Sequence, residues 1–223
     1  EKAVMVLGFQ EVKNIVLGKA VFNSFKELNS TNKKCIDSFW EHSFTCGLAA
    51  KVLAERFKLA PSEMFIAGLI HDIGKLAMLL TFPNIYSHLL TALEGNRLHN
   101  REKEIDLFFI SHDEVALRIL QRWLFPTRLI DAVGFHHHPH NAGEHQLLSL
   151  MVQMADSIAS VFHSPGGSLA ADRRVLMLNA QPDIFDLWKE RQLSCTREEV
   201  TIWFNLLEVS REKDSAVLAA FTS

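Results

Sequence analysis

Apolar residues along this chain recur at three- and four-residue spacing, and the alternating runs that form strands are nearly absent. Glycines and prolines, which number ten and six, interrupt the pattern only at wide intervals. The pattern therefore predicts an all-α protein. We expect helices over residues 9–28, 34–57, 62–80, 84–95, 111–123, 127–136 and 145–162, followed by a C-terminal group over 169–180, 183–191, 197–210 and 212–221.

The strongest linker signal is the run Ser164-Pro165-Gly166-Gly167-Ser168, whose residue types favour turns and loops. We place a boundary at residues 164–168, between a histidine-rich helical domain over residues 1–163 and a C-terminal helical extension over residues 169–223. The extension is expected to pack on the body of the domain. The first residue is Glu rather than Met, so we expect the chain to be a fragment.

The composition bears on the cellular compartment and on the binding partners that are expected for this protein. The formal charge of −3 provides no basic field, so nucleic acid is not expected as a partner. No uncharged apolar run approaches the ~20 residues that span a bilayer, so no membrane is expected either. The cysteines Cys35, Cys46 and Cys195 are odd in number and widely spaced, which favours a reducing cytoplasm over a disulfide framework.

Histidine placement carries the candidate chemistry. His71 and Asp72 lie in an apolar run that ends with Gly74 and Lys75. On a helix, neighbouring side chains point about 100° apart, and both can still reach ions lying across one end of the helix face. Imidazole and carboxylate together suit Zn²⁺, Mn²⁺ or Fe, and a carboxylate can bridge two ions. The pair therefore indicates a metal site.

Further candidate ligands lie on other predicted helices, namely His42, His112, His136, His137 and Asp156. Asp156 stands among Met154, Ile158 and Val161, where a carboxylate is costly to bury without a partner. A metal ion or a cationic side chain would be such a partner.

The ordered set resembles the HDOD family, the HD-related output domains of bacterial signalling proteins, within the superfamily of HD metal-dependent phosphohydrolases. The similarity runs over about residues 1–163, and Glu104 stands eight residues before His112 as part of it. The matching text is Ala3-Val4-Met5-Val6-Leu7-Gly8-Phe9, Phe39-Trp40-Glu41-His42-Ser43, Ala67-Gly68-Leu69-Ile70-His71-Asp72-Ile73-Gly74-Lys75-Leu76, His112-Asp113-Glu114-Val115-Ala116, Trp123-Leu124-Phe125-Pro126, His136-His137-His138-Pro139 and Ala155-Asp156.

The resemblance implies an HD-like helical bundle that binds divalent metal ions, with Fe, Mn, Zn and Mg as candidates. It implies catalytic roles for Asp72 and for Lys75, whose ammonium can contact a phosphate as a point charge. The implied metal ligands are His42, His71, Asp72, His112, His136, His137 and Asp156.

Departures from the family pattern bear on function. The helical subdomain that usually precedes the first matching segment is missing from this chain. The Gly-Tyr-Pro of the related cyclic-dinucleotide phosphodiesterases is absent, because Pro139 is followed by His140 and Asn141. Ser38 stands where those enzymes can use a glutamate, which argues against a third metal position.

Each candidate also has a purely structural alternative. His42 could be a hydrogen-bonded core histidine, and His112 could simply follow Ser111 as helix cap. His136 and His137 could be histidines attracted to a helix C-terminus by its dipole. Asp156 could be neutralised by a basic side chain. The remaining histidines are expected at the surface, namely His88, His99, His140, His145 and His163.

Two functions follow from these observations. The first is a signalling module that acts on other signalling proteins, with the cluster stabilising the fold. The second is a metal-dependent phosphohydrolase acting on a nucleotide or a cyclic dinucleotide. Its ions would lower the pKa of a bound water, while Lys75 and the ions take up developing charge.

Overall fold

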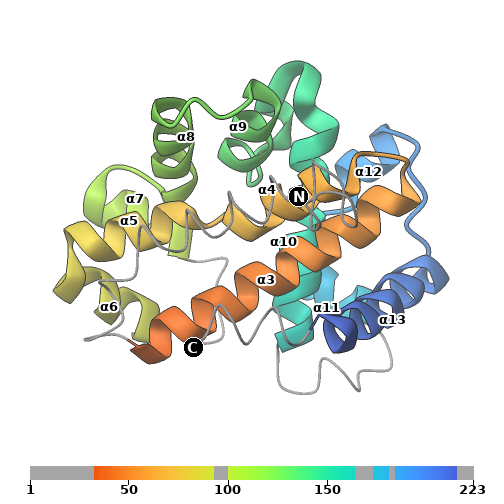
Figure 1. Ribbon diagram of the computed structural model, residues 1–223, viewed down its shortest axis with the longest axis horizontal. Helices are drawn as coiled ribbons and strands as arrows, with labels where there is room; N and C mark the ends of the chain where they lie inside the picture. Colours follow the sequence, from red (N-terminus) through yellow and green to blue (C-terminus); the bar gives the residue numbers. More distant parts are fainter. Residues whose placement is uncertain (1–32, 93–99, 164–172, 181–183, 215–223) are drawn as a thin grey trace, which may run out of the picture.

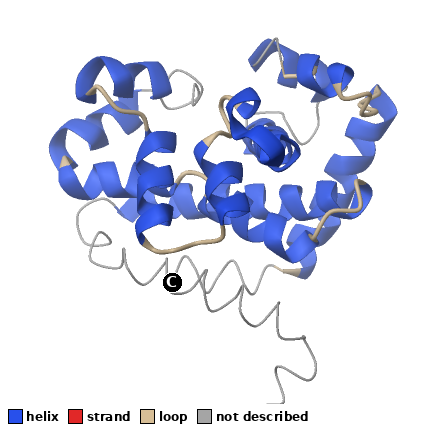
Figure 2. Cartoon of the chain, turned by 90° about the horizontal axis from the view of Figure 1, so that it is seen from above, coloured by secondary structure: helices blue, strands red, loops and turns tan. Residues whose placement is uncertain are grey.

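The regular structure is entirely helical within the part of the chain that the structure describes, as Figure 2 shows. The computed structural model describes residues 33–92, 100–163, 173–180 and 184–214. The all-α prediction is therefore confirmed. The elements are α3 (Lys33–Arg56), α4 (Pro61–Ile70), α5 (Ile73–Thr81), α6 (Pro83–Ala92), α7 (Asn100–Phe108), α8 (His112–Arg122), α9 (Thr127–Gly134), the 3-10 segment η3 (Pro139–His145), α10 (Gln146–His163), α11 (Arg173–Ala180), α12 (Asp186–Glu190) and α13 (Arg197–Lys213).

The centre of the fold is the long helix α3, which packs against α4 and α10 (Figure 1). Trp40, Phe44 and Leu53 of α3 are buried there. Glycine allows α3 and α4 to approach closely, because a Cβ on Gly68 would lie 2.7 Å from the carbonyl oxygen of Cys46. The packing thereby brings the last turn of α4 next to the middle of α3.

The expected helix over 62–80 is divided in two at His71 and Asp72, and the prediction of one continuous helix was wrong there. The amide of Lys75 donates to the carbonyl of Asp72 at 2.8 Å, which tightens the turn that opens α5. A Cβ on Gly74 would lie only 2.0 Å from the carbonyl oxygen of His112. Glycine is thus required where α5 meets the start of α8, and no proline marks this tertiary break in the sequence.

The segments α7 and η3 were not predicted. Most of α7 is charged and exposed, and Glu104 is its one fully buried side chain among those described, so the apolar helical pattern is missing. The expected helix over 9–28 and the expected linker over 164–168 lie outside the described residues. Most of the expected helix over 212–221 also lies outside them.

Helix α13 packs along α3, and α12 lies beside the residue that follows α3. The ring of Phe57 contacts that of Trp188 at 5.1 Å between centroids, and Trp188 packs on Trp203 at 5.6 Å. Thr196 and Glu199 form a reciprocal capping box at the start of α13. This part of the chain therefore has an apolar core that is continuous with the body.

Two apolar features of the surface and core stand out. The stretch Pro61–Thr81 is long and apolar enough to cross a membrane, but 78% of its most apolar window is buried within the fold. Burial of this kind is typical of a core helix.

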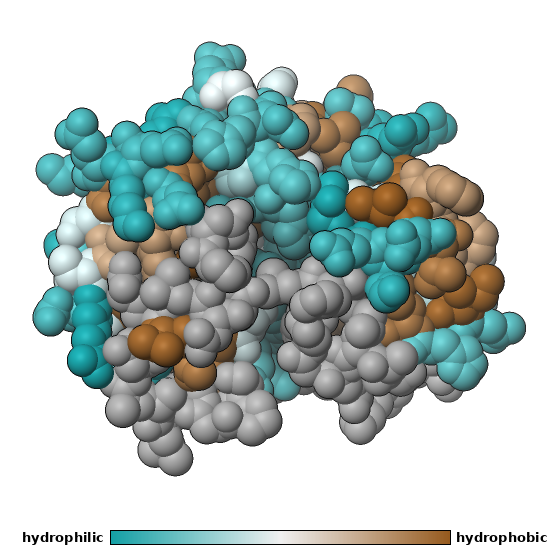
Figure 3. All heavy atoms as spheres, turned by 180° about the vertical axis from the view of Figure 1, so that it is seen from behind, coloured by the Kyte–Doolittle hydropathy of each residue, from teal (hydrophilic) through white to brown (hydrophobic). Residues whose placement is uncertain are grey.

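Exposed apolar side chains also gather at the end of the molecule built from α5, α6 and α7 (Figure 3), namely Leu80, Phe82, Ile85, Ile105, Leu107 and Phe109.

Candidate metal centre

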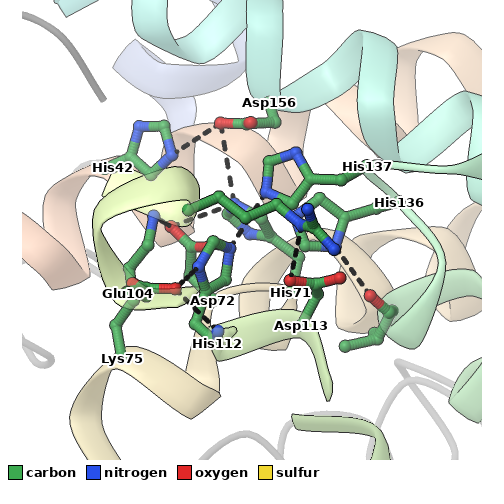
Figure 4. Close-up of polar contacts among 12 residues, drawn as sticks. His42, His71, Asp72, Lys75, Glu104, His112, Asp113, His136, His137 and Asp156 are labelled. Atoms are coloured by element: carbon green, nitrogen blue, oxygen red, sulfur yellow. Dashed lines mark hydrogen bonds and ion pairs between the residues drawn. The ribbon is translucent and has the colours of Figure 1, made fainter. Parts of the chain in front are cut away.

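All of the metal ligands expected from the sequence meet in one cluster inside the bundle (Figure 4). They come from the middle of α3, the turn between α4 and α5, the first residue of α8, the segment after α9, and α10. Ligand atoms lie within 4.8 Å of one another in three overlapping groups. The groups are His42 with His71 and Asp156, His71 with Asp72 and His136, and His112 with His136 and His137.

The two carboxylates lie between imidazole nitrogens. Asp156 Oδ1 is 3.0 Å from His42 Nε2 and 3.6 Å from His71 Nε2. Asp72 presents Oδ2 to His71 Nε2 at 3.3 Å and Oδ1 to His112 Nε2 at 3.2 Å. Ligands held about 2.0–2.2 Å from one ion stand about 3.0–3.5 Å apart. The spacing therefore fits coordination, and Asp72 offers one oxygen to each side as a bridging carboxylate does.

Backbone carbonyls set the orientation of two imidazoles. His71 Nδ1 donates to the carbonyl of Gly68 at 2.8 Å, and His136 Nδ1 donates to the carbonyl of Val133 at 2.6 Å. The buried Nε2 of His136 has no hydrogen-bond partner among the described residues, whereas the buried Nε2 of His71 faces the carboxylates of Asp72 and Asp156 at 3.3 and 3.6 Å. A buried polar atom without a partner is uncommon and costly. This arrangement leaves Nε2 as the free lone pair of a metal ligand, with the other nitrogen anchored.

A buried glutamate orients His112. Glu104 Oε2 accepts hydrogen bonds from His112 Nδ1 at 2.6 Å and from the His112 amide at 2.7 Å. Its other oxygen accepts from the hydroxyl of Tyr86 at 2.5 Å, and Tyr86 is the single tyrosine of the chain. His112 Nε2 then faces Asp72 and lies 3.0 Å from His137 Nε2. The sequence places Glu104 in the segments that resemble the family but predicts no role for it.

The charges of the cluster do not balance without a cation. Asp72, Asp156 and Glu104 contribute three negative charges and Lys75 one positive charge, which leaves two negative charges if the imidazoles are neutral. Lys75 Nζ lies 2.6 Å from Asp72 Oδ2, so its ammonium is a direct partner of the ligand set. Burial raises the pKa of the Asp72 carboxyl, but His71 and Lys75 outweigh this and hold it well below its usual range. The carboxylates therefore remain ionised and require positive charge nearby.

Protons supply this charge when no ion is present. Burial lowers the pKa of His71, yet the charge of Asp72 outweighs it and holds that pKa well above its usual range. The same balance with Glu104 raises the pKa of His112 to about 9. Burial, together with these two cations, lowers the pKa of His136 to about 4. Two imidazolium protons or one divalent ion would neutralise the cluster equally well, so the residues fit a divalent metal ion.

Two histidines expected at the surface are instead half-buried. His145 Nδ1 contacts Asp131 Oδ2 at 2.7 Å, and His163 Nε2 contacts Thr45 Oγ1 at 3.0 Å. Packing of η3 against α9 places His145, and packing of α10 against α3 places His163, which local sequence does not reveal. His88 and His140 are exposed as expected, and His99 lies outside the described residues.

The family of the chain follows from a sequence comparison. The model of the HDOD domain matches residues 1–139, which is more than half of the chain. The chain belongs to the HDOD domain family. Asp156 is the one candidate metal ligand that lies beyond the matched residues. Helix α13 also lies beyond them.

A curated relative of this HDOD chain is an uncharacterized protein of Treponema pallidum, 21% identical over 158 residues. The match covers 70% of this chain but only 30% of that protein.

Three solved structures share the fold. One is a protein from Shewanella amazonensis that is described as a candidate phosphohydrolase. It superposes with a TM-score of 0.73 and 20% sequence identity, and the match covers 99% of this chain and 76% of that one. Another is an HDOD domain protein of unknown function from Geobacter sulfurreducens, with TM-score 0.68, 22% identity, and coverage of 99% and 72%. The third is the MmoQ response regulator of Methylococcus capsulatus, with TM-score 0.53, 22% identity, and coverage of 74% and 60%. At these identities the similarity establishes the fold alone.

Proposed function

We propose that this HDOD chain is a signal-transduction module whose His/Asp cluster holds one or two divalent metal ions. One observation carries the metal assignment. The Nδ1 atoms of His71 and His136 are anchored on backbone carbonyls, so that the buried Nε2 of His71 faces two carboxylates and the buried Nε2 of His136 has no hydrogen bond. Family membership and the shared fold of a response regulator support the signalling role.

The chain would hold the ions in two adjoining positions. His42, His71 and Asp156 would form one position, called the outer position because Asp156 is partly exposed, and His112 with His136 or His137 would form the other. Asp72 lies between the two positions, with one oxygen on each side. A bound ion would supply Lewis acidity and would lower the pKa of a coordinated water.

In the signalling role the bound ion would connect segments of the chain that are far apart in the sequence. The ligands come from α3, the α4–α5 turn, α8, the end of α9, and α10, which are far apart in the sequence. Where a metal site exists only in the folded chain, the free energy of metal binding stabilises the folded state. Metal occupancy would therefore set how firmly these helices hold together, and other signalling proteins would be the partners that read this state.

A metal-dependent phosphohydrolase is the second candidate, and the position of Lys75 favours it. The ammonium of Lys75 lies on Asp72, so a positive charge stands beside the would-be bridging carboxylate. Asp156 is partly exposed at 16% of its side chain, and His137 is also half-buried rather than buried. A nucleotide or a cyclic dinucleotide would reach the ions from this side, with Lys75 and Asp72 in the catalytic roles.

One pair of measurements separates the candidates. The full chain, purified without chelators, is assayed for bound metal and then for hydrolysis of nucleotides and cyclic dinucleotides with Mn²⁺ or Fe²⁺. A signalling module binds metal without turnover, and His71→Ala then lowers its stability. Turnover that disappears in Asp72→Asn while the fold survives would establish the enzyme instead. A chain that takes up no divalent metal would refute the metal assignment in both.

A further inference from the structure

Arg211 of α13 joins the C-terminal extension to the two helices that carry outer metal ligands. Helix α13 lies beside α3 and α11 (Figure 1). The guanidinium of Arg211 donates to Thr45 Oγ1 at 2.8 Å and contacts Glu41 Oε1 at 3.2 Å. Both partners are on α3. Arg211 also stacks over the ring of Phe162 of α10, with its Cζ 4.9 Å from the ring centroid.

These contacts surround the backbone position of His42. Glu41 precedes His42 directly, and Thr45 follows it by about one helical turn. On α10, His163 lies 3.0 Å from Thr45 Oγ1, and its ring centroid is 6.3 Å from that of His42. Arg211 therefore holds α3 against α10 at the level of His42, and its side chain is only 19% exposed.

A metal ion in the outer position would depend on the same arrangement. His42 and Asp156 approach to 3.0 Å across the contact between α3 and α10. An ion bound to both and a guanidinium bridging the same two helices each stabilise one relative placement of these helices. Two events that favour one state raise each other's affinity by the same factor.

We propose that Arg211 is a positioning residue for the metal centre, and that docking of α13 and metal occupancy are coupled through it. The inference rests on the proposed metal binding. It assigns a role to a segment outside the residues matched by the family model. The C-terminal helix is then the element whose docking reports whether the outer position is filled.

The chain offers a matched control in Arg173 of α11. Arg173 contacts Glu208 Oε1 at 2.8 Å, and its Cζ lies 4.6 Å from the ring centroid of Phe204. It thus combines a carboxylate and an aromatic ring as Arg211 does, but both of these partners are on α13 and neither is next to a metal ligand in the sequence. Loss of general packing in the C-terminal helices affects both variants, whereas loss of positioning affects Arg211→Gln alone.

The test compares Mn²⁺ binding by wild type, Arg211→Gln and Arg173→Gln, after metal removal, by isothermal titration. Substitutions that disorient a metal ligand typically weaken binding about 10- to 100-fold, so Arg211→Gln is expected to raise the Kd about tenfold or more. Arg173→Gln is expected to leave it within about twofold. Because coupling is reciprocal, Mn²⁺ is also expected to slow amide hydrogen exchange in α13 of wild type and much less in Arg211→Gln.

Glu41→Gln provides a milder variant if Arg211→Gln does not fold, since the contact of Arg211 with Thr45 is kept. It is expected to weaken Mn²⁺ binding in the same direction, and an unchanged Kd would overturn the inference. An unchanged Kd in a folded Arg211→Gln, or Mn²⁺-independent exchange in α13, overturns it as well. Wild type that binds no Mn²⁺ refutes the proposed function together with this inference, whereas normal binding with an unaffected Arg211→Gln refutes the inference alone.

Discussion

Removal of the Glu104 carboxylate is the perturbation whose cost the structure defines most fully. Glu104 is completely buried and accepts hydrogen bonds from the Tyr86 hydroxyl and from two nitrogens of His112. Hydrogen bonds to charged groups contribute about 1.5–3 kcal/mol each, and they are not additive. Removing one partner of a buried charge pair costs about 3–5 kcal/mol. We expect Glu104→Ala to lower the free energy of unfolding by about 3–5 kcal/mol.

Glu104→Gln separates charge from shape. The amide oxygen of Gln can still accept from both nitrogens of His112, and its NH₂ group can donate to the hydroxyl of Tyr86 once that hydroxyl rotates. Only the charge of the pair is then lost, so about 1–2 kcal/mol is expected. The measurement is urea unfolding in the presence of a chelator. Glu102→Gln, on the exposed side of the same helix, is the control and should remain within about 0.5 kcal/mol of wild type. A Glu104→Ala variant as stable as this control would refute the reasoning.

Further predictions concern the close packing and the protonation of the cluster. Gly74→Ala should lower the free energy of unfolding by about 3 kcal/mol or more, because its Cβ would meet the carbonyl of His112; urea midpoints equal to wild type would contradict this. In metal-free protein, the raised pKa values of His71 and His112 stabilise the fold below pH 6.5, and this stability is lost as the pH rises toward about 9. Unfolding midpoints should therefore fall between these pH values in chelator, and a flat or rising profile would contradict the assignment. Metal uptake near pH 7 should release about two protons, which titrations in buffers of different ionisation enthalpy measure; no release would contradict the exchange of protons for metal.

The metal cluster could be anticipated because its members carry local signals. His71 and Asp72 are polar residues in an apolar run, and Asp156 is a carboxylate among apolar neighbours. Such residues require a buried partner wherever the chain places them. The resemblance then supplied the order in which His42, His112 and the paired histidines belong to the same site.

The contacts that orient the ligands could not be anticipated in the same way. Glu104 reaches His112 through the turn between α7 and α8, in which Phe109 has a positive φ of 57°, and Arg211 reaches Glu41 across 170 residues of sequence. The turn at His71 and Asp72 likewise depends on Gly74 meeting α8. These features arise from turn geometry and from packing between segments, which helical periodicity does not encode. The order of the helices was therefore more predictable than their breaks and their cross-links.

The proposed metal centre can be tested by locating bound Mn²⁺ in crystals of the protein. Crystals of the full chain grown with Mn²⁺ are measured for anomalous scattering. A metal centre built from these residues should give one or two peaks within about 2.0–2.3 Å of the facing nitrogen and oxygen atoms of His71, Asp72, His112 and Asp156. Peaks only at the protein surface, or none in Mn²⁺-saturated crystals, would contradict a metal centre in this bundle.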